Sequence, residues 1–385
     1  MENNDDRYNI LYLIQSQKLG GAEISTLLLV KNLNRAKYMP YVLAPGNSIV
    51  ENEFNKLDVK TISFNLPQVK TYNFVKLIIN SFTLLKHCIE IRKIIKRYKI
   101  DIVHSVSNKR SAVYSILSAK ISKVPVVWTI RVLDRVKIID SILLKLSDKV
   151  IAISEAVKKR YVDESTNIKG KITRIYNAVD LKEFDEGKCD NKVLREKWDV
   201  EDNDFVVAIA SRVIPIKGHI TFIKAAALVL NKYPEMKFVV IGDTNYFNDS
   251  SYYQSLLELS CFLNIESEIK FVGQENNIPL MMSNIDILVL CCPDEPFGRV
   301  VIEAMAMKKP VIAPNTAGPS EIVIDGQTGY LIMPENPEKL ADAIIKVYQS
   351  PNIRKKMGAA SRQRVQDLFS LPKYISEYEK IYDCI

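Results

Sequence analysis

Short apolar runs alternate with segments of helical period along most of this 385-residue chain. Each apolar run predicts a strand, while apolar residues spaced three and four apart between the runs predict helices. Strands are expected at residues 10–15, 41–44, 59–63, 102–105, 126–129 and 150–153, and again at 205–211, 237–241, 269–272, 287–290, 311–313 and 329–332. Strands that alternate with helices are typical of parallel sheets covered by helices.

The two series of strands predict an α/β protein with two doubly wound, Rossmann-like domains. A chain of 385 residues is too long for one typical core and fits two. The join is expected in the polar stretch 177–192, where the buried-strand pattern lapses. Ligands of doubly wound sheets bind beyond the carboxyl ends of the strands, so we expect the site in the cleft between two such domains.

From its composition and its polar first residues, we expect a cytoplasmic protein. Hydrophobic residues make up 47% and charged residues 25% of the chain, which is ordinary for a soluble globular protein. No apolar run approaches the roughly 18 residues that cross a bilayer, and the polar residues 1–6 do not form a signal peptide. The six cysteines lack metal-ligand spacing, so we interpret them as reduced thiols.

The net charge of +8 is unevenly distributed. Residues 1–185 contain 31 Lys and Arg against 18 Asp and Glu, a net charge of +13, whereas the remainder carries −5. A basic half favours an anionic partner such as a phospholipid surface, a lipid diphosphate or a nucleic acid. The helix expected at 72–99 has a basic end. One interpretation is a helix that covers the sheet and leaves its basic end in solvent, and another is a surface helix that docks onto anionic lipid. The two interpretations do not exclude each other.

The most specific motif is a pair of acids, Glu295 and Glu303, which follow the apolar strand at 287–290. A helix is expected to begin near Gly298, where free backbone amides can hold a phosphate or a sugar hydroxyl. Glu295 would precede the helix and Glu303 would lie within it, so the two acids could hold different ends of one nucleotide sugar. Acids are also favoured at helix N-termini without any ligand, and position alone leaves both interpretations open.

This motif resembles the Glu, seven residues, Glu signature of the retaining glycosyltransferases of family 4. Similar matches extend, in order and spacing, from about residue 9 to about residue 340. They are Gly20-Gly21-Ala22-Glu23, Asn177-Ala178-Val179-Asp180 with Phe184, Ser211-Arg212 with Lys217-Gly218, and residues 317–321 followed by 325–329. The resemblance implies the GT-B fold, with an acceptor-binding domain at 1–182, a donor-binding domain at 183–365, and a C-terminal helix at 366–385 that joins the first domain.

The resemblance also implies donor-binding roles. Arg212 and Lys217 would hold the diphosphate, Glu303 the ribose and Glu295 the transferred sugar, while the Gly20-Gly21 loop closes over the donor. The complete donor set is Gly20, Gly21, Arg212, Lys217, Gly273, Glu295, Phe297, Gly298, Arg299, Val300 and Glu303. A Gly-Gly turn that lacks a third glycine does not favour a nicotinamide cofactor.

On the acceptor side the resemblance points to Glu23, His104 and Arg131. Glu23 is either an acid in the first turn of a helix or an acceptor contact, and His104 is either an acceptor contact or a hydrogen-bonded core residue. Arg131 stands where many members of the family carry a histidine. Arginine cannot act as a general acid or base near neutral pH, so we expect it to contact a phosphate or an anionic acceptor.

We therefore expect a retaining, metal-independent hexosyl- or N-acetylhexosaminyltransferase with catalytic roles for Glu295, Arg212, Lys217, Arg131 and His104. No cofactor is expected, since Asp202-Asn203-Asp204 precedes a strand instead of following one. The donor would be a UDP- or GDP-sugar, and the acceptor a saccharide or lipid-linked saccharide for surface polysaccharide or glycolipid. We expect no nucleic acid partner, and an anionic membrane surface on the cytoplasmic side could contact the basic half. The alternatives are a nucleotide-sugar epimerase of related fold and a non-catalytic module that binds nucleotide sugar or nucleic acid.

Overall fold

The computed structural model describes residues 7–67, 74–106, 109–162, 170–189, 193–245 and 249–385. The chain forms two compact units: unit 1 comprises Met1–Asn177 with Pro372–Ile385, and unit 2 comprises Ala178–Leu371. The polar start at 1–6, residues 72–73 of the expected basic helix and residues 190–192 of the expected join lie outside the described residues. The assignment of residues 1–182 to acceptor binding and of residues 183–365 to donor binding stays a prediction.

Unit 1 is built on a seven-stranded parallel sheet with the order β3-β2-β1-β4-β5-β6-β7. Its strands are β1 (Tyr8–Leu13), β2 (Tyr38–Ala44), β3 (Lys60–Ser63), β4 (Ile102–Ser105), β5 (Val126–Ile130), β6 (Lys149–Ala152) and β7 (Ile172–Arg174). Every residue of β4 and β5 is buried, as expected for central strands that are covered on both faces.

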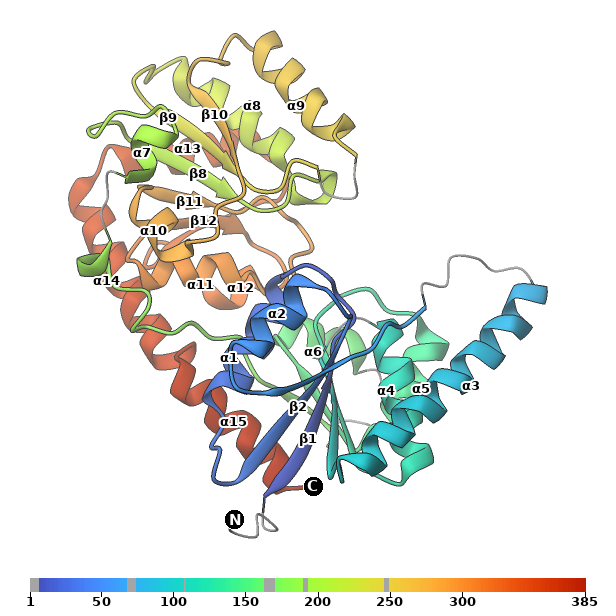
Figure 1. Ribbon diagram of the computed structural model, residues 1–385. Helices are drawn as coiled ribbons and strands as arrows, with labels where there is room; N and C mark the ends of the chain where they lie inside the picture. The colour runs from blue at the N-terminus through green and yellow to red at the C-terminus, as the bar shows by residue number, and fades with distance from the viewer. Residues whose placement is uncertain (1–6, 68–73, 107–108, 163–169, 190–192, 246–248) are drawn as a thin grey trace. The chain divides into compact units, whose positions relative to one another are not determined.

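Helices cover both faces of this sheet. They are α1 (Gly21–Asn32), α2 (Ile49–Asn55), α3 (Phe74–Arg97), α4 (Lys109–Ser122), α5 (Lys137–Leu146) and α6 (Glu155–Tyr161), joined by the C-terminal helix α15 (Leu371–Asp383). Figure 1 shows α3, α4 and α5 together on one side of the strands. Right-handed crossovers explain this grouping, because the connections from β3 to β6 all run in one direction across the sheet.

The helix α15 packs against unit 1 through a row of tyrosines. Tyr374, Tyr378 and Tyr382 are buried, and the Tyr382 hydroxyl lies 2.9 Å from the hydroxyl of Tyr12 on β1. The Tyr374 hydroxyl donates to the carbonyl of Ser25 on α1 at 3.1 Å. The last turns of the chain therefore complete the core of unit 1 although they follow all of unit 2 in sequence.

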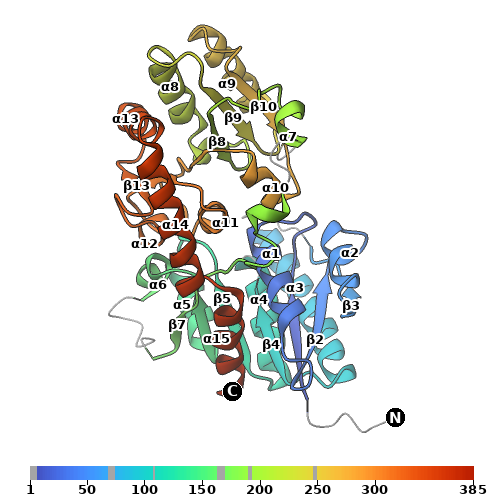
Figure 2. The same ribbon diagram turned by 90° about the vertical axis from the view of Figure 1, so that its left-hand side faces the viewer.

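Unit 2 contains a six-stranded parallel sheet with the order β10-β9-β8-β11-β12-β13. Its strands are β8 (Val206–Ala210), β9 (Lys237–Ile241), β10 (Ile269–Gly273), β11 (Ile287–Val289), β12 (Val311–Pro314) and β13 (Gly329–Ile332). Its helices are α7 (Val193–Lys197), α8 (His219–Leu230), α9 (Ser251–Phe262), α10 (Ile278–Ser283), α11 (Arg299–Ala306), α12 (Pro319–Ile322), α13 (Pro337–Tyr348) and α14 (Pro351–Leu368), with 3-10 turns η1 (Glu186–Lys188) and η2 (Pro215–Lys217). Figure 2 shows these elements from a second direction.

The predicted fold class is confirmed, since both sheets are parallel and each is flanked by helices. All twelve expected strands are present within a few residues of their predicted ranges. The prediction missed β7, which has three residues of which one is buried, and so carries almost no hydrophobic pattern. Within the described ranges, the structure contains no helix that is long and apolar enough to span a membrane.

Candidate functional site

The candidate donor site of unit 2 lies where the order of its strands reverses. β8 pairs with β9 on one side and with β11 on the other, and both pairings are parallel. In sheets of this order, ligands bind beyond the carboxyl ends of the strands at the reversal point. The loops that follow β8 and β11 are therefore adjacent, and they carry most of the predicted donor-binding residues.

The loop after β8 contains Arg212, the 3-10 turn η2 and Lys217. Arg212 is exposed, and its carbonyl accepts a hydrogen bond from the amide of Ile214 at 2.9 Å. Gly218 then begins α8 with a φ of 74°. A Cβ at Gly218 would lie 2.6 Å from the carbonyl oxygen of Cys291, so only glycine lets the two loops approach this closely.

Lys217 and Glu295 form an ion pair across these two loops. The Lys217 Nζ donates to the Glu295 Oε2 at 2.6 Å, and each side chain is about one-sixth exposed, at 15% and 17% respectively. The sequence predicted that both residues contact the donor, and the structure additionally shows that they contact each other. The ammonium group is thereby held at the carboxyl edge of the sheet, where it still reaches solvent.

The helix α11 begins at Arg299, four residues after Glu295, with Gly298 as its N-cap. Gly298 has a φ of 96°, in the left-handed region that favours glycine. The preceding Phe297 is buried and its ring lies 5.9 Å from that of Phe369, which anchors the turn. The amide of Val301 donates to the carbonyl of Gly298 at 3.0 Å, and the amides of a first helical turn, here including the half-buried Val300, point out of the end of the helix.

Arg299 and Glu303 form a second ion pair within α11. The Arg299 Nη2 donates to the Glu303 Oε1 at 2.8 Å, and the side chains are 13% and 9% exposed. The Arg299 Nη1 also donates to the carbonyl of Ala178 at 3.4 Å. Arg299 therefore fixes the rotamer of Glu303 and balances its charge, a role that the Glu, seven residues, Glu spacing did not reveal.

The loop after β12 supports the Glu295 segment, and sequence reasoning missed these contacts. Thr316 Oγ1 donates to the carbonyl of Pro293 at 2.6 Å, and the amide of Gly318 donates to the carbonyl of Glu295 at 3.1 Å. The motif at 317–321 indicated a loop of interest but not its partner. Only the pairing of β11 with β12 places the two loops together.

Gly273, another predicted donor residue, ends β10, which is separated from β11 by the strands β9 and β8. Its carbonyl accepts from the amide of Gly242 at 2.8 Å, which ties the end of β10 to the loop after β9. Gly273 thus lies at the same edge of the sheet as Lys217 and Glu295.

Together these groups suit an anionic, polyhydroxylated ligand. The N-termini of α8 and α11 carry partial positive charge, and Lys217 and Arg212 add two cations. Glu295 and Glu303 add acceptors for hydroxyl groups. Cations and amide dipoles that are already in place can stabilise the charge of a departing diphosphate.

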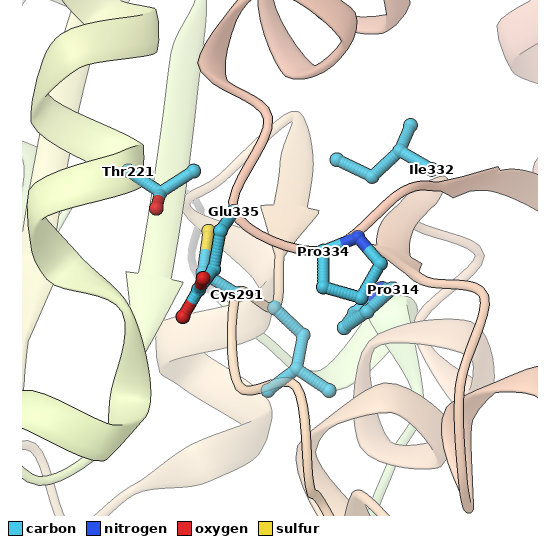
Figure 3. A pocket seen from close by; sticks show the side chains of 7 residues that line it. Thr221, Cys291, Pro314, Ile332, Pro334 and Glu335 are labelled. Carbon is cyan, nitrogen blue, oxygen red and sulfur yellow. The ribbon is translucent and has the colours of Figure 1, made fainter.

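A small recess in unit 2 is separate from these residues. Figure 3 shows its lining of Thr221, Leu290, Cys291, Pro314, Ile332, Pro334 and Glu335, from the carboxyl ends of β11, β12 and β13 and the first turn of α8. None of the predicted donor residues lines it. Its walls are mostly apolar, so it offers few groups that would recognise a phosphate or a sugar.

In unit 1 the Gly20-Gly21 loop opens α1 at the carboxyl end of β1, as predicted. Both glycines are exposed. The Glu23 Oε2 accepts from the amide of Gly20 at 3.0 Å, and Glu23 is only 7% exposed. Of the two interpretations of Glu23, this geometry favours an acid that caps the first turn of the helix over an acceptor contact.

Arg131 follows β5 and is held by two hydrogen bonds within unit 1. Its Nε donates to the carbonyl of Val106 at 3.0 Å, and its Nη1 donates to the Oδ1 of Asn177 at 3.0 Å. Asn177 is buried, and sequence reasoning had assigned it only to the join. The orientation of the Arg131 guanidinium is therefore fixed at the carboxyl edge of the sheet, close to the end of β4.

His104 lies in the core of unit 1, and this geometry does not support its expected catalytic and acceptor-binding roles. It is 0% exposed, with Nδ1 2.7 Å from the Tyr382 hydroxyl and Nε2 2.8 Å from the Thr129 hydroxyl. Burial, and secondarily the positive charge of Arg131, lowers the pKa of His104 well below its usual value. A neutral imidazole with both nitrogens occupied is a structural residue.

The six cysteines are unpaired, and burial raises the pKa of Cys291 to about 12. Across the described stretches of the chain, no group of three or more His, Cys, Asp or Glu side chains is arranged to hold a metal ion.

Comparison with known families gives two matches that together span most of the chain. Residues 19–183 match the model of Glycosyltransferase Family 4, and residues 190–364 match the model of Glycosyl transferases group 1. The two matched segments meet in the region where the chain passes from unit 1 into unit 2.

Two distant relatives extend over most of the length of the chain. The capsular polysaccharide biosynthesis glycosyltransferase CapM of Staphylococcus aureus is 26% identical over 85% of this chain and 90% of its own. The UDP-Gal:alpha-D-GlcNAc-diphosphoundecaprenol alpha-1,3-galactosyltransferase of Escherichia coli is 24% identical over 95% of this chain and 97% of its own. Among solved structures, a glycosyltransferase from Rickettsia africae is 27% identical, with a TM-score of 0.85 and 98% coverage of both chains. Anabaena HepE, solved with UDP and glucose, shares the fold at 22% identity and a TM-score of 0.84 over 98% of this chain and 99% of its own.

Proposed function

The chain belongs to the glycosyltransferases of the family 4 type, and on this premise we propose that it transfers a hexose or N-acetylhexosamine from a nucleotide sugar to a saccharide or lipid-linked saccharide. The transfer retains the anomeric configuration and needs no metal ion. The product contributes to a surface polysaccharide or a glycolipid, in line with the names of CapM and the galactosyltransferase.

The observation that carries this proposal is the Lys217–Glu295 ion pair at the strand reversal of unit 2. A lysine held at 2.6 Å from a carboxylate keeps its charge at one point, where it can stabilise the diphosphate as the sugar leaves. Glu295 then contacts hydroxyls of the transferred sugar, and its position next to the ammonium fixes the sugar relative to the phosphate. Arg212 adds the second cation.

Glu303 binds the ribose diol in this proposal, and Arg299 holds its carboxylate in place. The amides of Phe297, Gly298 and Val300 hold the sugar. No side chain of this set is assigned as a nucleophile, so we favour front-face displacement, in which the leaving phosphate helps to remove the proton of the acceptor hydroxyl. In unit 1, Arg131 contacts a phosphate or an anionic acceptor.

The donor should be tested first among UDP-sugars, since HepE was solved with UDP and the galactosyltransferase is named for UDP-Gal. A thermal-shift panel of UDP- and GDP-sugars measures binding directly, because a ligand that binds the folded state raises its stability. We expect the sugars of one nucleotide, UDP or GDP, to raise the melting temperature of the protein. Glu303→Ala should abolish this rise. Donor consumption with and without a chelator, and NMR of the anomeric proton of the product, then test metal independence and retention.

No stabilisation by any nucleotide sugar, or unchanged turnover in Glu303→Ala, would refute the assignment. The epimerase alternative requires a side chain that handles protons at a sugar carbon. Its one candidate, His104, is buried with both ring nitrogens occupied, so the described geometry gives it no support.

A further inference from the structure

The ammonium group of Lys217 is shared with its neighbours in unit 2. A lysine has three N–H donors, and one of them donates to the Glu295 Oε2 at 2.6 Å. The Lys217 Nζ also lies 4.0 Å from the Sγ of the buried Cys292. Because 15% of the side chain is exposed, a phosphate oxygen can still approach the ammonium from solvent. Such an oxygen meets a cation whose charge is already balanced by a carboxylate.

Both partners of this ion pair are fixed by their loops. The Lys217 amide donates to the carbonyl of Ile214 at 3.0 Å, and the Glu295 carbonyl accepts from the amide of Gly318 at 3.1 Å. The Glu295 Cγ lies close to the start of α11, since a Cβ at Gly298 would be 3.6 Å from it. The carboxylate therefore stays beside the ammonium when an anion arrives at the lysine.

The second acid of the site, Glu303, is paired in a different way. Its Oε1 accepts from the Arg299 Nη2 at 2.8 Å, and Arg299 lies one turn earlier on the same helix. Glu303 therefore takes no charge from Lys217. Of the two acids, only Glu295 shares a cation with the expected diphosphate.

A nucleotide sugar and the nucleotide left after transfer interact differently with this carboxylate. Two acceptors of one ammonium lie about 4 Å apart, so a diphosphate oxygen on Lys217 would lie that close to Glu295. Their negative charges repel each other, and the repulsion is stronger where water is partly excluded, as it is around this pair. Hydroxyl groups of a bound sugar donate to the carboxylate and offset the repulsion. The spent nucleotide lacks these donors, and its terminal phosphate carries about one further negative charge at neutral pH.

We propose that Glu295 makes the site discriminate between the nucleotide sugar and the spent nucleotide. In this inference, which rests on the proposed function, the carboxylate weakens the binding of any diphosphate that brings no sugar hydroxyls. After transfer, the sugar no longer contacts Glu295, and repulsion by its carboxylate favours release of the nucleotide from Lys217. Glu295 thereby determines specificity for the donor over its product, in addition to holding the sugar.

The first test uses inorganic pyrophosphate as the probe, because it contains the diphosphate without base, ribose or sugar. Glu295→Gln removes the charge but keeps an oxygen that can accept from Lys217. In isothermal titration calorimetry, pyrophosphate should bind Glu295→Gln about tenfold more tightly than the wild type, because an adjacent like charge is gone. Equal or weaker binding to the variant, or no binding to either protein, overturns the proposal.

The matched control is Glu303→Gln, which makes the same change at the acid that is paired with Arg299. It should leave the affinity for pyrophosphate unchanged, and an equal gain in this control would refute the specific role of Glu295. Circular dichroism and urea unfolding show whether each variant is folded. Glu295→Ala should give the same gain as Glu295→Gln, so a folding defect in one of these variants leaves the other as the test.

The second test compares the spent nucleotides UDP and GDP with their sugars. The measured quantity is the dissociation constant of the nucleotide divided by that of the nucleotide sugar. Glu295→Gln should lower this ratio about tenfold or more. Glu303→Gln should weaken both ligands equally, because both contain the ribose, and should leave the ratio unchanged. An unchanged ratio in Glu295→Gln overturns the proposed discrimination.

The two tests separate this inference from the proposed function. A protein that consumes a nucleotide sugar, but whose Glu295→Gln variant changes neither the pyrophosphate affinity nor the ratio, keeps the proposed function and refutes the inference. Tighter binding of pyrophosphate by Glu295→Gln, with no binding of any nucleotide sugar, refutes the proposed function and still supports the effect of Glu295 on a diphosphate. In turnover assays, added nucleotide should inhibit Glu295→Gln at lower concentrations than it inhibits the wild type.

Discussion

Replacing Lys217 by methionine is the sharpest test of the donor site. The change removes the positive charge but retains most of the apolar length of the side chain, so packing is disturbed little. It also breaks the 2.6 Å contact with Glu295 and leaves that carboxylate, which is 17% exposed, without its cation. The variant should therefore differ from the wild type in catalysis and, more modestly, in stability.

The two effects differ in size. Loss of one cation that stabilises the leaving diphosphate should cost about 2 to 4 kcal/mol of transition-state stabilisation, or roughly 30- to 1000-fold in kcat/KM. The ion pair is neither fully buried nor exposed, so its loss should cost about 1 to 2 kcal/mol of unfolding free energy. For a unit of this size, that corresponds to a fall in Tm of about 2 to 8 °C.

The assay measures consumption of the preferred nucleotide sugar at several donor concentrations, together with urea unfolding of each variant. Lys217→Arg keeps the charge and should lose less activity than Lys217→Met. Lys232→Met is the control, because Lys232 is exposed just beyond the other end of α8. A Lys217→Met enzyme that keeps its kcat/KM within threefold of the wild type would contradict the proposed role of the ion pair.

Three further predictions concern the architecture that supports the site. Gly218→Ala should lower the unfolding free energy by about 2 kcal/mol or more, because its Cβ would lie 2.6 Å from the Cys291 carbonyl oxygen; Gly187→Ala, which meets only an ordinary contact, should be nearly neutral in the same urea titration. Burial lowers the pKa of His104, so below pH 6.5 the unfolded chain binds more protons at this residue than the folded protein does. The free energy of unfolding should therefore fall by up to about 1.4 kcal/mol for each pH unit below that value. His104→Asn should reduce this dependence in urea titrations between pH 7.5 and 5. Tyr382→Phe removes the buried hydroxyl that contacts His104 and should cost about 1 to 3 kcal/mol by denaturant unfolding, whereas an unchanged midpoint would show that this contact is not stabilising.

Local sequence was sufficient for the fold class and for most of the strands. A strand such as β11 is apolar throughout and buried on both faces, so its run of side chains predicts it without knowledge of its neighbours. The turn at Gly298 could also be anticipated, since glycine is favoured where φ is positive and the helical period of α11 begins there. The strand β7 could not be anticipated, because it is short and half-exposed and has no apolar run.

The sequence by itself therefore determined two doubly wound sheets and the loops in which the candidate residues lie. The tertiary structure decided which of these residues meet. Lys217 and Glu295 are 78 positions apart, and they pair because β8 and β11 are neighbours in the sheet. His104 and Tyr382 are 278 positions apart, and they meet because the chain returns to unit 1 as α15. The spacing of hydrophobic residues indicates only whether a residue is buried. Contacts between residues so distant in sequence are set by strand order and helix packing, which no local pattern encodes.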